Sequence, residues 1–153
     1  MRNTKSKVAL IIVSILIVAV LGSVFVNLGS DWFNSLDKPS QWIPNIVIPI
    51  VWTVVYVVFG ILLSVWVSRE PIPMKIVVWL FINGILNILW CLVFFTLELT
   101  FLGNIVIILN LWAGIILFYQ IYNHKSLYGL IVSIYPVWLS IATTLNTAMW
   151  ILN

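Results

Sequence analysis

The sequence contains very little charge. Only 7% of its 153 residues are Asp, Glu, Lys or Arg, whereas 63% are hydrophobic and the mean hydropathy is +1.20. A soluble domain of this length needs a charged exterior, which seven basic and four acidic side chains cannot form. The composition therefore excludes an ordinary soluble domain and predicts an integral membrane protein. The net charge of +3 is spread too thinly to indicate binding to nucleic acid.

Cysteine and histidine are almost absent. The single cysteine, Cys91, excludes an internal disulfide, and we interpret it as a small apolar filler. The single histidine, His124, falls in a polar connector, where a solvated position is expected. The sequence shows no metal-binding cluster, paired nucleophile and base, G-x-G-x-x-G motif or P-loop. Neither a metal site nor conventional catalysis is expected, and any enzymatic activity would have to be radical or photochemical.

Long apolar runs dominate the chain, and five of them are long enough to cross about 30 Å of hydrocarbon as helices. Barrel strands would be shorter and would alternate polar with apolar residues. The first run is too long for a signal peptide and no A-x-A cleavage site follows it. We predict an all-α integral membrane protein with one domain, residues 1–153, that forms a single bundle of five transmembrane helices. The spans are about 8–28, 46–68, 76–97, 104–122 and 127–152.

The basic residues fall on one side of this predicted topology. Lys38 alone lies on the other side, in the long connector 29–45. The remaining basic residues are Arg2, Lys5, Lys7, Arg69, Lys75 and Lys125. Because basic residues collect on the cytoplasmic side of a membrane, we expect a cytoplasmic N-terminus, with the C-terminus and the long connector outside.

Nine tryptophans are unusual for a chain of this length, and their positions differ. Those near span ends fit an aromatic belt at the headgroup level: Trp66, Trp79 and Trp150. Others lie six or more residues inside a span and need another explanation: Trp52, Trp90, Trp112 and Trp138. The connector 29–45 is also rich in rings, including Trp32 and Trp42, which predicts a partly ordered lid.

Helical spacing places polar and aromatic residues on one face of three spans. The stripe on the second span is Pro49, Trp52, Thr53, Tyr56 and Gly60. The stripe on the third span is Trp79, Asn83, Asn87, Trp90 and Phe94. The stripe on the fifth span is Tyr135, Trp138, Ala142, Leu145, Asn146 and Met149. Unpaired polar atoms facing acyl chains cost several kcal/mol, so these faces should turn inward, leaving Ile, Leu and Val for lipid.

Two interpretations of the inward amides remain open. Asn83, Asn87, Asn110 and Asn146 could link helices by hydrogen bonds, as amides do in membranes. They could instead line a cavity, since Trp52, Asn87, Trp90, Trp112 and Asn146 lie at a similar depth in the outer leaflet, with Asn83 and Trp138 a little deeper. Stacking indoles and a few amides suit a flat hydrophobic ligand with a polar edge.

Three motifs resemble those of the TspO/MBR family, the tryptophan-rich sensory protein and translocator protein family, also called the peripheral-type benzodiazepine receptors. The segment 38–40, "KPS", is followed by "VWTVVYVVFG" at 51–60. The other two motifs are "NILWCLVFF" at 87–95 and "YPVWLSIATTLN" at 135–146. The family often has Trp after K-P-S and a Pro-Pro pair, where this chain has Gln41, Trp42, Ile43 and Pro44. The proline that usually precedes the Tyr of the last motif is Ile134, and Pro136 follows that Tyr instead.

The resemblance implies a five-helix bundle, often dimeric, in a bacterial-type inner (plasma) membrane. It implies binding of porphyrins such as protoporphyrin IX and haem, of benzodiazepine- and isoquinoline-type drugs and, in animal relatives, of cholesterol. Some relatives degrade porphyrin in light, which makes Trp52 and Trp138 the candidate reactive indoles. The motifs and the stripes together predict these ligand-binding residues: Trp32, Trp52, Tyr56, Asn83, Asn87, Trp90, Trp138, Ala142, Leu145 and Asn146.

We therefore expect a receptor or sensor for a porphyrin or another flat apolar molecule, surrounded by membrane lipid and without an obligatory cofactor. Because no histidine lies near the site, metal-free porphyrin should bind about as well as haem. A passive transporter is the alternative, since the spans hold no ionisable residue for charge-coupled transport. The pattern "LFYQIYNHK" at 117–125 fits a weak sterol-binding motif but is also an ordinary helix end. Small residues could support close helix contacts or a homodimer: Gly84, Gly103, Ala113 and Gly114.

Overall fold

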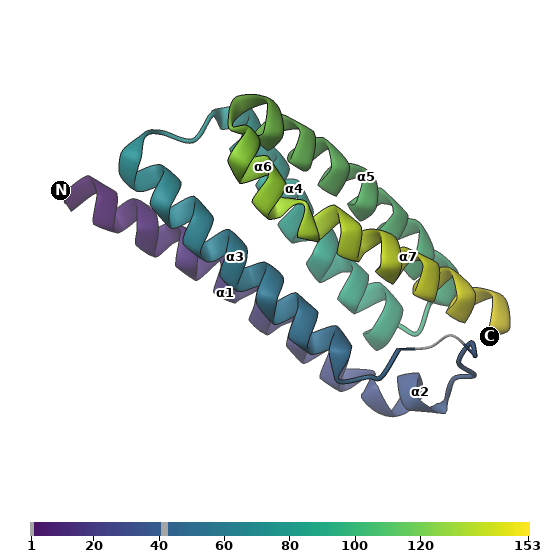
Figure 1. Ribbon diagram of the computed structural model, residues 1–153. Coiled ribbons are helices and arrows are strands. Elements are labelled where there is room, and N and C mark those ends of the chain that lie inside the picture. The colour runs from purple at the N-terminus through teal and green to yellow at the C-terminus, as the bar shows by residue number, and fades with distance from the viewer. Residues whose placement is uncertain (1, 41–42) are drawn as a thin grey trace.

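The computed structural model describes residues 2–40 and 43–153, and these form helices joined by short connectors (Figure 1). The helices are α1 (Arg2–Leu28), α2 (Ser30–Ser35), α3 (Val47–Arg69), α4 (Met74–Cys91), the π-helical turn η1 (Leu92–Thr96), α5 (Thr100–His124), α6 (Ser126–Val132) and α7 (Ile134–Leu152). Within the described ranges there is no β-strand, which confirms the all-α fold. Gln41 and Trp42 of the predicted lid lie outside the described residues.

Five helical segments are long and apolar enough to cross a membrane, as predicted, and the protein is a multi-pass membrane protein. These segments are Asn3–Leu28, Val47–Arg69, Met74–Thr96, Thr100–His124 and Ser126–Leu152. Most run a few residues beyond the expected spans, because polar residues continue a helix once the apolar run has nucleated it. The long connector is ordered in part, since α2 lies within it.

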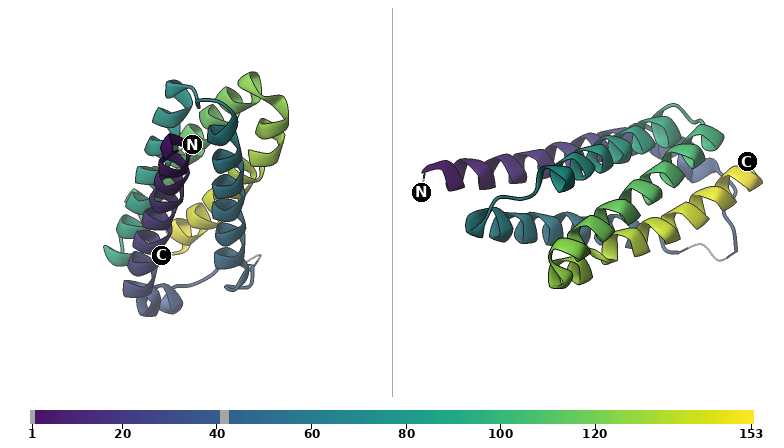
Figure 2. Two further views of the ribbon diagram at one scale, coloured as in Figure 1. Left: turned by 90° about the vertical axis from the view of Figure 1, so that its left-hand side faces the viewer. Right: turned by 90° about the horizontal axis from the view of Figure 1, so that it is seen from above.

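The helices surround a common centre in the order α1, α3, α6–α7, α5, α4. The most extensive contacts join α4 to α5 and α5 to α7, and α1 packs against both α3 and α4 (Figure 2). The two chain ends lie at opposite ends of the bundle (Figure 1). We call the end that holds the start of α1 the N-terminal end, and the end that holds α2 and the end of α7 the C-terminal end.

The last span is broken at Ser133, between α6 and α7. Pro136 has no N–H to donate to the carbonyl four residues earlier, so the helical ladder is interrupted there. The Ser133 N–H instead donates to the Leu130 carbonyl at 3.4 Å, which tightens the turn. The changed proline position noted in the sequence therefore still produces a break in this span.

The C-terminal end of α4 continues as a π-helical turn, η1. The Leu97 N–H donates to the Leu92 carbonyl five residues earlier, at 2.9 Å. The wider turn presents Phe94 and Phe95 to the interior, where both are buried. Gly103 of α5 allows the close approach, because a Cβ at this position would lie 2.8 Å from the Phe94 side chain.

The N-terminal half of the bundle has a closely packed core. Its buried members are Val55, Phe59, Leu62, Leu63, Trp66, Ile76, Leu117, Ile121, Val132, Tyr135 and Leu139. Trp66 is fully buried, so its assignment to an aromatic belt was wrong. The assumption that aliphatic residues would be left to lipid was also wrong for Val55, Leu62 and Leu63, since burying them completes the core.

Other predicted positions divide between interior and surface. The fifth-span stripe is buried throughout, as predicted. Trp112 is 66% exposed and points out of the bundle, so its predicted place on the cavity wall was wrong. Gly84 lies against Val18 of α1 and Gly114 lies against Leu139 of α7. These two small residues therefore serve contacts within the chain.

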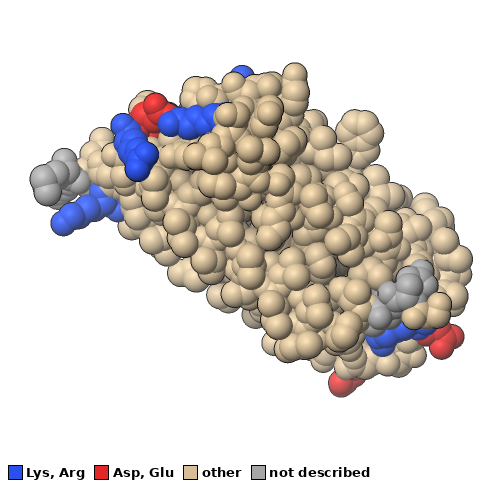
Figure 3. Space-filling model, viewed as in Figure 1, with Lys and Arg blue, Asp and Glu red and all other residues tan. Residues whose placement is uncertain are grey.

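The charged side chains gather at the two ends of the bundle and leave a broad uncharged surface between them (Figure 3). At the N-terminal end, Lys125 forms an ion pair with Glu70 and lies 5.6 Å from the Trp66 ring centroid. The Lys125 ammonium holds the pKa of the Glu70 carboxyl below its usual value. These contacts join the α3–α4 connector to the α5–α6 junction.

Candidate functional site

A hollow of about 450 Å³ opens beside α1 in the C-terminal half of the bundle. Helices α1, α2, α3 and α4, the turn η1 and the connector before α3 contribute to its wall. The lining residues are Ala19, Gly22, Ser23, Val26, Asn27, Ser30, Phe33, Asn34, Asn45, Ile48, Pro49, Trp52, Thr53, Tyr56, Asn87, Trp90, Cys91 and Phe95. The volume falls within the roughly 300–1,000 Å³ range of small-molecule sites.

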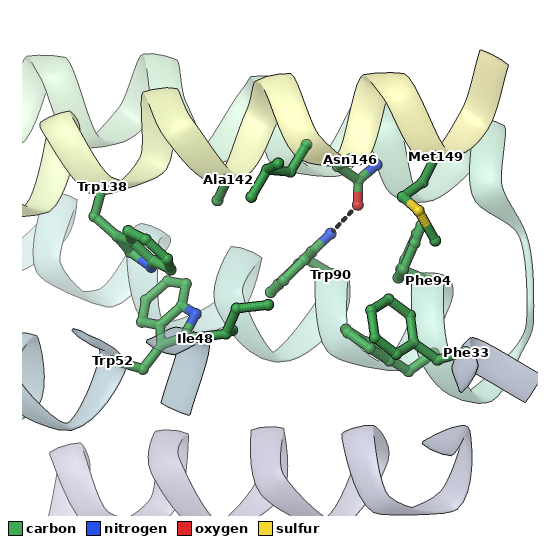
Figure 4. A pocket seen from close by; sticks show the side chains of 11 residues that line it. Phe33, Ile48, Trp52, Trp90, Phe94, Trp138, Ala142, Asn146 and Met149 are labelled. Atoms are coloured by element: carbon green, nitrogen blue, oxygen red, sulfur yellow. Dashed lines mark hydrogen bonds between the residues drawn. The ribbon is translucent and has the colours of Figure 1, made fainter. Parts of the chain in front are cut away.

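A second, smaller space of about 40 Å³ lies on the α7 side of the same helices. Its wall consists of Phe33, Ile48, Trp52, Trp90, Phe94, Phe95, Trp138, Ala142, Leu145, Asn146 and Met149 (Figure 4). We call the two spaces the large hollow and the slit. Five residues line both of them: Phe33, Ile48, Trp52, Trp90 and Phe95.

Trp52 stands at the centre of the aromatic contacts between these spaces. Its ring stacks on Tyr56 with a centroid distance of 5.8 Å and lies 6.3 Å from Trp90. It meets the edge of Trp138 at 6.4 Å and an interplanar angle of 87°. Indole faces and edges from α3, α4 and α7 therefore surround the site, and flat aromatic ligands can stack on such faces.

Polar bonds hold Trp90 in place. Its indole N–H donates to the Asn146 side-chain oxygen at 3.0 Å (Figure 4). The Thr147 hydroxyl donates to the Asn104 side-chain oxygen at 2.8 Å, and the Asn146 amide lies 3.5 Å from the same oxygen. This cluster joins α4, α5 and α7, so the orientation of Trp90 is determined before any ligand binds.

Trp138 differs from Trp90 because its indole N–H has no hydrogen-bond partner among the described residues. The side chain is only 5% exposed, so water does not satisfy this donor freely. Figure 4 shows the ring nitrogen on the side that faces Trp52. A buried donor without a partner costs free energy, and a ligand acceptor in the slit would recover that cost.

A second polar cluster lies next to the large hollow and links α4, α5 and α7. The Asn87 side-chain N–H₂ donates to the Tyr135 hydroxyl at 2.8 Å, and the Asn110 N–H₂ donates to the Asn87 oxygen at 2.9 Å. The Tyr135 hydroxyl donates to the Asn83 oxygen at 3.0 Å. Helix linking, the first of the two interpretations, therefore describes Asn83 and Asn110. Asn87 takes part in the network and also lines the large hollow.

The structure brings most of the predicted ligand-binding residues together around the two spaces. The ones on these walls are Trp52, Tyr56, Asn87, Trp90, Trp138, Ala142, Leu145 and Asn146. Neither Asn83 nor Trp32 belongs to the described lining. Trp32 instead packs edge-on against Phe94, with centroids 5.6 Å apart.

The contribution of α1 to the large hollow was not expected from the sequence. The lining residues of α1 lie on one face of the helix and, apart from Val26, are small or polar: Ala19, Gly22, Ser23, Val26 and Asn27. Their spacing was readable, but the residues lack rings and were taken as part of an apolar run. Cys91 also faces the large hollow, where we expected only a filler.

His124 lies at the opposite end of the bundle from this site. It is exposed, as expected, and its ring stacks on Trp66 with centroids 5.6 Å apart and an interplanar angle of 15°. Within residues 2–40 and 43–153, no group of three or more His, Cys, Asp or Glu residues is placed to hold a metal ion. The described site is therefore aromatic and neutral.

Known proteins are similar to this chain over nearly its whole length. The model of the TspO/MBR family matches residues 10–151. "Protein CrtK" of Rhodobacter capsulatus is 28% identical over 130 residues, which is 80% of this chain and 78% of that protein. "Tryptophan-rich protein TspO" of Archaeoglobus fulgidus is 30% identical over 144 residues, which is 93% of this chain and 94% of that protein. On the match to the family model over residues 10–151, the chain belongs to the TspO/MBR family, and its five apolar helices make it a multi-pass membrane protein.

Proposed function

We propose that this protein is a membrane receptor that binds porphyrins, such as protoporphyrin IX or haem, in the large hollow. The main support for this proposal is that the indoles of Trp52 and Trp90 form part of the wall of the hollow, whose volume is about 450 Å³. A planar ring system gains both burial and stacking there, and Tyr56 offers a hydroxyl to its edge. Benzodiazepine- and isoquinoline-type molecules, which are also flat and apolar, would occupy the same space.

The packing of the N-terminal half supports a receptor rather than a passive transporter. Phe59, Leu63 and Tyr135 belong to a continuous buried core on that side of the site. A ligand crossing the bundle would have to open this core, whereas binding from one side leaves it intact. Porphyrin flux into proteoliposomes should therefore stay at the protein-free rate, and flux that depends on Trp52 would favour the transporter.

We place the protein in a bacterial-type inner (plasma) membrane with a cytoplasmic N-terminus. This orientation rests on the basic residues near the N-terminal end, among them Lys5, Lys75 and Lys125, against Lys38 at the other end. The large hollow would then open in the outer leaflet. Reporter fusions at the two chain ends test the orientation, and an external N-terminus would overturn it.

The decisive experiment is a titration of protoporphyrin IX into detergent-solubilised protein, followed by indole fluorescence in the dark. Replacing Trp52 or Trp138 by Phe should remove part of the quenching. Trp52→Phe should also weaken binding by about 1 kcal/mol, roughly fivefold, because a stacking contact becomes smaller. Trp138→Phe should weaken binding less, because Trp138 lines only the slit and acts on the hollow through its edge contact with Trp52. Trp112→Phe is the matched control, since Trp112 is 66% exposed and lies on the outer surface.

Equal quenching and equal affinity in wild type, Trp52→Phe and Trp138→Phe would remove both residues from the site. Saturable binding that only Trp112→Phe weakens would move the ligand to the outer surface. The same titration under illumination tests photochemistry at Trp52 and Trp138, whose rings are in edge contact. Loss of porphyrin absorbance that depends on light and on these two indoles would make the protein an enzyme. Unchanged absorbance would make it a receptor only.

The chemistry of the wall also predicts how haem compares with metal-free porphyrin. The hollow offers stacking residues and no histidine, although the Cys91 sulfur is part of the wall. We expect protoporphyrin IX and haem to bind with similar affinity through their rings. Much tighter haem binding, with a thiolate-type spectrum that Cys91→Ser abolishes, would contradict this expectation.

A further inference from the structure

Neutral polar side chains line the large hollow at the C-terminal end of the bundle, and we call this part its mouth because Asn27, Asn34 and Asn45 are exposed there. Asn27 lies one residue before the end of α1, Ser30 and Asn34 belong to α2, and Asn45 precedes α3. All four therefore lie at the C-terminal end of the bundle, while Trp52 lies about one and a half turns further into α3. Deeper inside, the rings of Trp52, Tyr56 and Trp90 join the wall.

No charged residue belongs to the described lining of this hollow. The Lys38 ammonium lies close to this lining. It donates to the Phe33 carbonyl at 3.3 Å and lies 5.0 Å from the Phe33 ring centroid. Phe33 itself lines the hollow. Lys38 forms no ion pair with the acidic side chains that the structure describes, in contrast to Lys125.

The backbone next to Lys38 is held at the mouth by the end of α7. The Asp37 N–H donates to the Asn153 side-chain oxygen at 3.0 Å, and the Asn153 amide donates back to the Asp37 carbonyl at 3.1 Å. This reciprocal pair fixes the starting point of the Lys38 side chain. Its long, flexible stem can exchange a carbonyl partner for an anion at the mouth.

This order of polarity matches a planar aromatic ligand with carboxylates along one edge. Amide N–H₂ groups and an ammonium form short, strong hydrogen bonds with carboxylates. A carboxylate buried among the rings would lose its hydration without compensation, whereas one at the mouth keeps contact with water. The arrangement therefore favours one orientation, with the rings inward and the acidic edge outward.

We propose that Asn27, Asn34 and Lys38 bind the carboxylates of the porphyrin at the mouth of the large hollow and so select dicarboxylate porphyrins over their esters. This inference rests on the proposed porphyrin binding and adds its specificity and orientation. It also gives a ligand-binding role to Asn27 of α1 and Asn34 of α2, two amides that were not predicted from the sequence to bind a ligand.

The first test compares protoporphyrin IX with its dimethyl ester, titrated in the dark into the full-length protein in detergent. Both compounds have the same ring, and only the acid carries charge. We expect the ester to bind about tenfold more weakly, the size expected for losing a charge-assisted hydrogen bond.

The second test uses variants with matched controls at the opposite end of the bundle. Lys38→Met and the double variant Asn27→Leu, Asn34→Leu should weaken acid binding about three- to tenfold and leave ester binding unchanged. Unchanged ester affinity shows that each variant is folded. Lys75→Met and Asn123→Leu make the same chemical changes at exposed positions and should alter neither affinity.

The outcomes separate this inference from the proposed function. Equal affinity of acid and ester in the wild type, or equal loss of both in the mouth variants, overturns carboxylate recognition while porphyrin binding stands. Failure of both compounds to bind the wild type overturns porphyrin binding itself and the inference with it. A selective loss of acid binding in Lys75→Met would place the carboxylates at the wrong end of the bundle.

Discussion

The N-terminal and C-terminal halves of this bundle are formed by the same helices but are packed differently. Along α3, the buried residues Phe59, Leu62 and Leu63 pack in the N-terminal half, where α3 contacts α6 and α7. In the C-terminal half, Trp52 and Tyr56 are only half-buried and border the large hollow. The side chains of the first group fill the space between the helices, whereas the rings of the second group border space that a ligand can occupy.

Polar groups in this bundle also differ in whether they have hydrogen-bond partners within the chain. The network around Tyr135 satisfies its amides within the chain and links three helices. In the C-terminal half, the Trp138 N–H and the mouth residues Asn27 and Asn34 make no side-chain hydrogen bond that the structure describes. The network around Tyr135 thus stabilises the bundle, whereas the Trp138 N–H and the amides of Asn27 and Asn34 remain available to a ligand.

The largest effect should come from truncating the packed core. Leu139 is fully buried, and Leu139→Ala should lower the free energy of unfolding by about 3 kcal/mol through lost contacts and an internal cavity. Thermal unfolding in detergent measures this loss. Ile141→Ala is the control, because Ile141 is 43% exposed on the same helix. A large loss of porphyrin affinity in folded Leu139→Ala would show that the halves are not independent.

A close backbone contact should give the next largest effect, this time in the C-terminal half. A Cβ on Gly29 would lie 1.9 Å from the Phe95 carbonyl oxygen, so Gly29→Ala must push α1 and η1 apart. We expect a destabilisation of about 2 kcal/mol together with weaker porphyrin binding, because Phe95 lines both spaces.

Gly60→Ala serves as the control for that substitution. The nearest atom to its added Cβ would be the Ile15 side chain at 3.7 Å, which is ordinary van der Waals contact. We expect Gly60→Ala to be neutral or slightly stabilising, since alanine favours a helix over glycine. Equal melting temperatures for the two variants would show that the contact at Gly29 can relax.

Removing one hydroxyl should have a moderate effect. Tyr135→Phe deletes the group that joins Asn83 and Asn87 and should cost about 1 kcal/mol. Asn87 keeps its bond to the Asn83 backbone carbonyl at 3.0 Å, which limits the loss. Tyr119→Phe, at a 60% exposed position, should leave the melting temperature unchanged. Strong loss of porphyrin affinity in Tyr135→Phe alone would assign the network to the ligand site.

The smallest effect should come from the ion pair at the N-terminal end. Because Lys125 lowers the pKa of Glu70, the pair stabilises the folded state above the ordinary pKa of a glutamate. This contribution is lost as the pH falls through the lowered pKa in the folded protein. Glu70→Gln should therefore remove part of the decline in melting temperature on acidification, with Glu98→Gln as control. An identical pH profile would show that solvent screens the pair completely.

How far the sequence could predict this protein depends on the kind of contact. The spans and the buried faces of α4 and α7 were predictable, because each follows from the spacing of polar and aromatic residues along one helix. The burial of Trp66 and the exposure of Trp112 were missed, because Trp66 was placed by its position near a span end and Trp112 by its depth, and neither criterion says which side of a helix faces its neighbours. Their positions depend on which helix packs beside them.

The sequence by itself determined that this chain crosses a membrane five times and turns its amides inward. An unpaired polar group in hydrocarbon costs free energy on each helix separately, so no knowledge of neighbours is needed. Only the tertiary structure decided that Asn83 links helices while Asn87 also borders a hollow, and that α1 supplies part of the wall. Those outcomes depend on distances between helices, which packing in three dimensions sets and no single helical pattern contains.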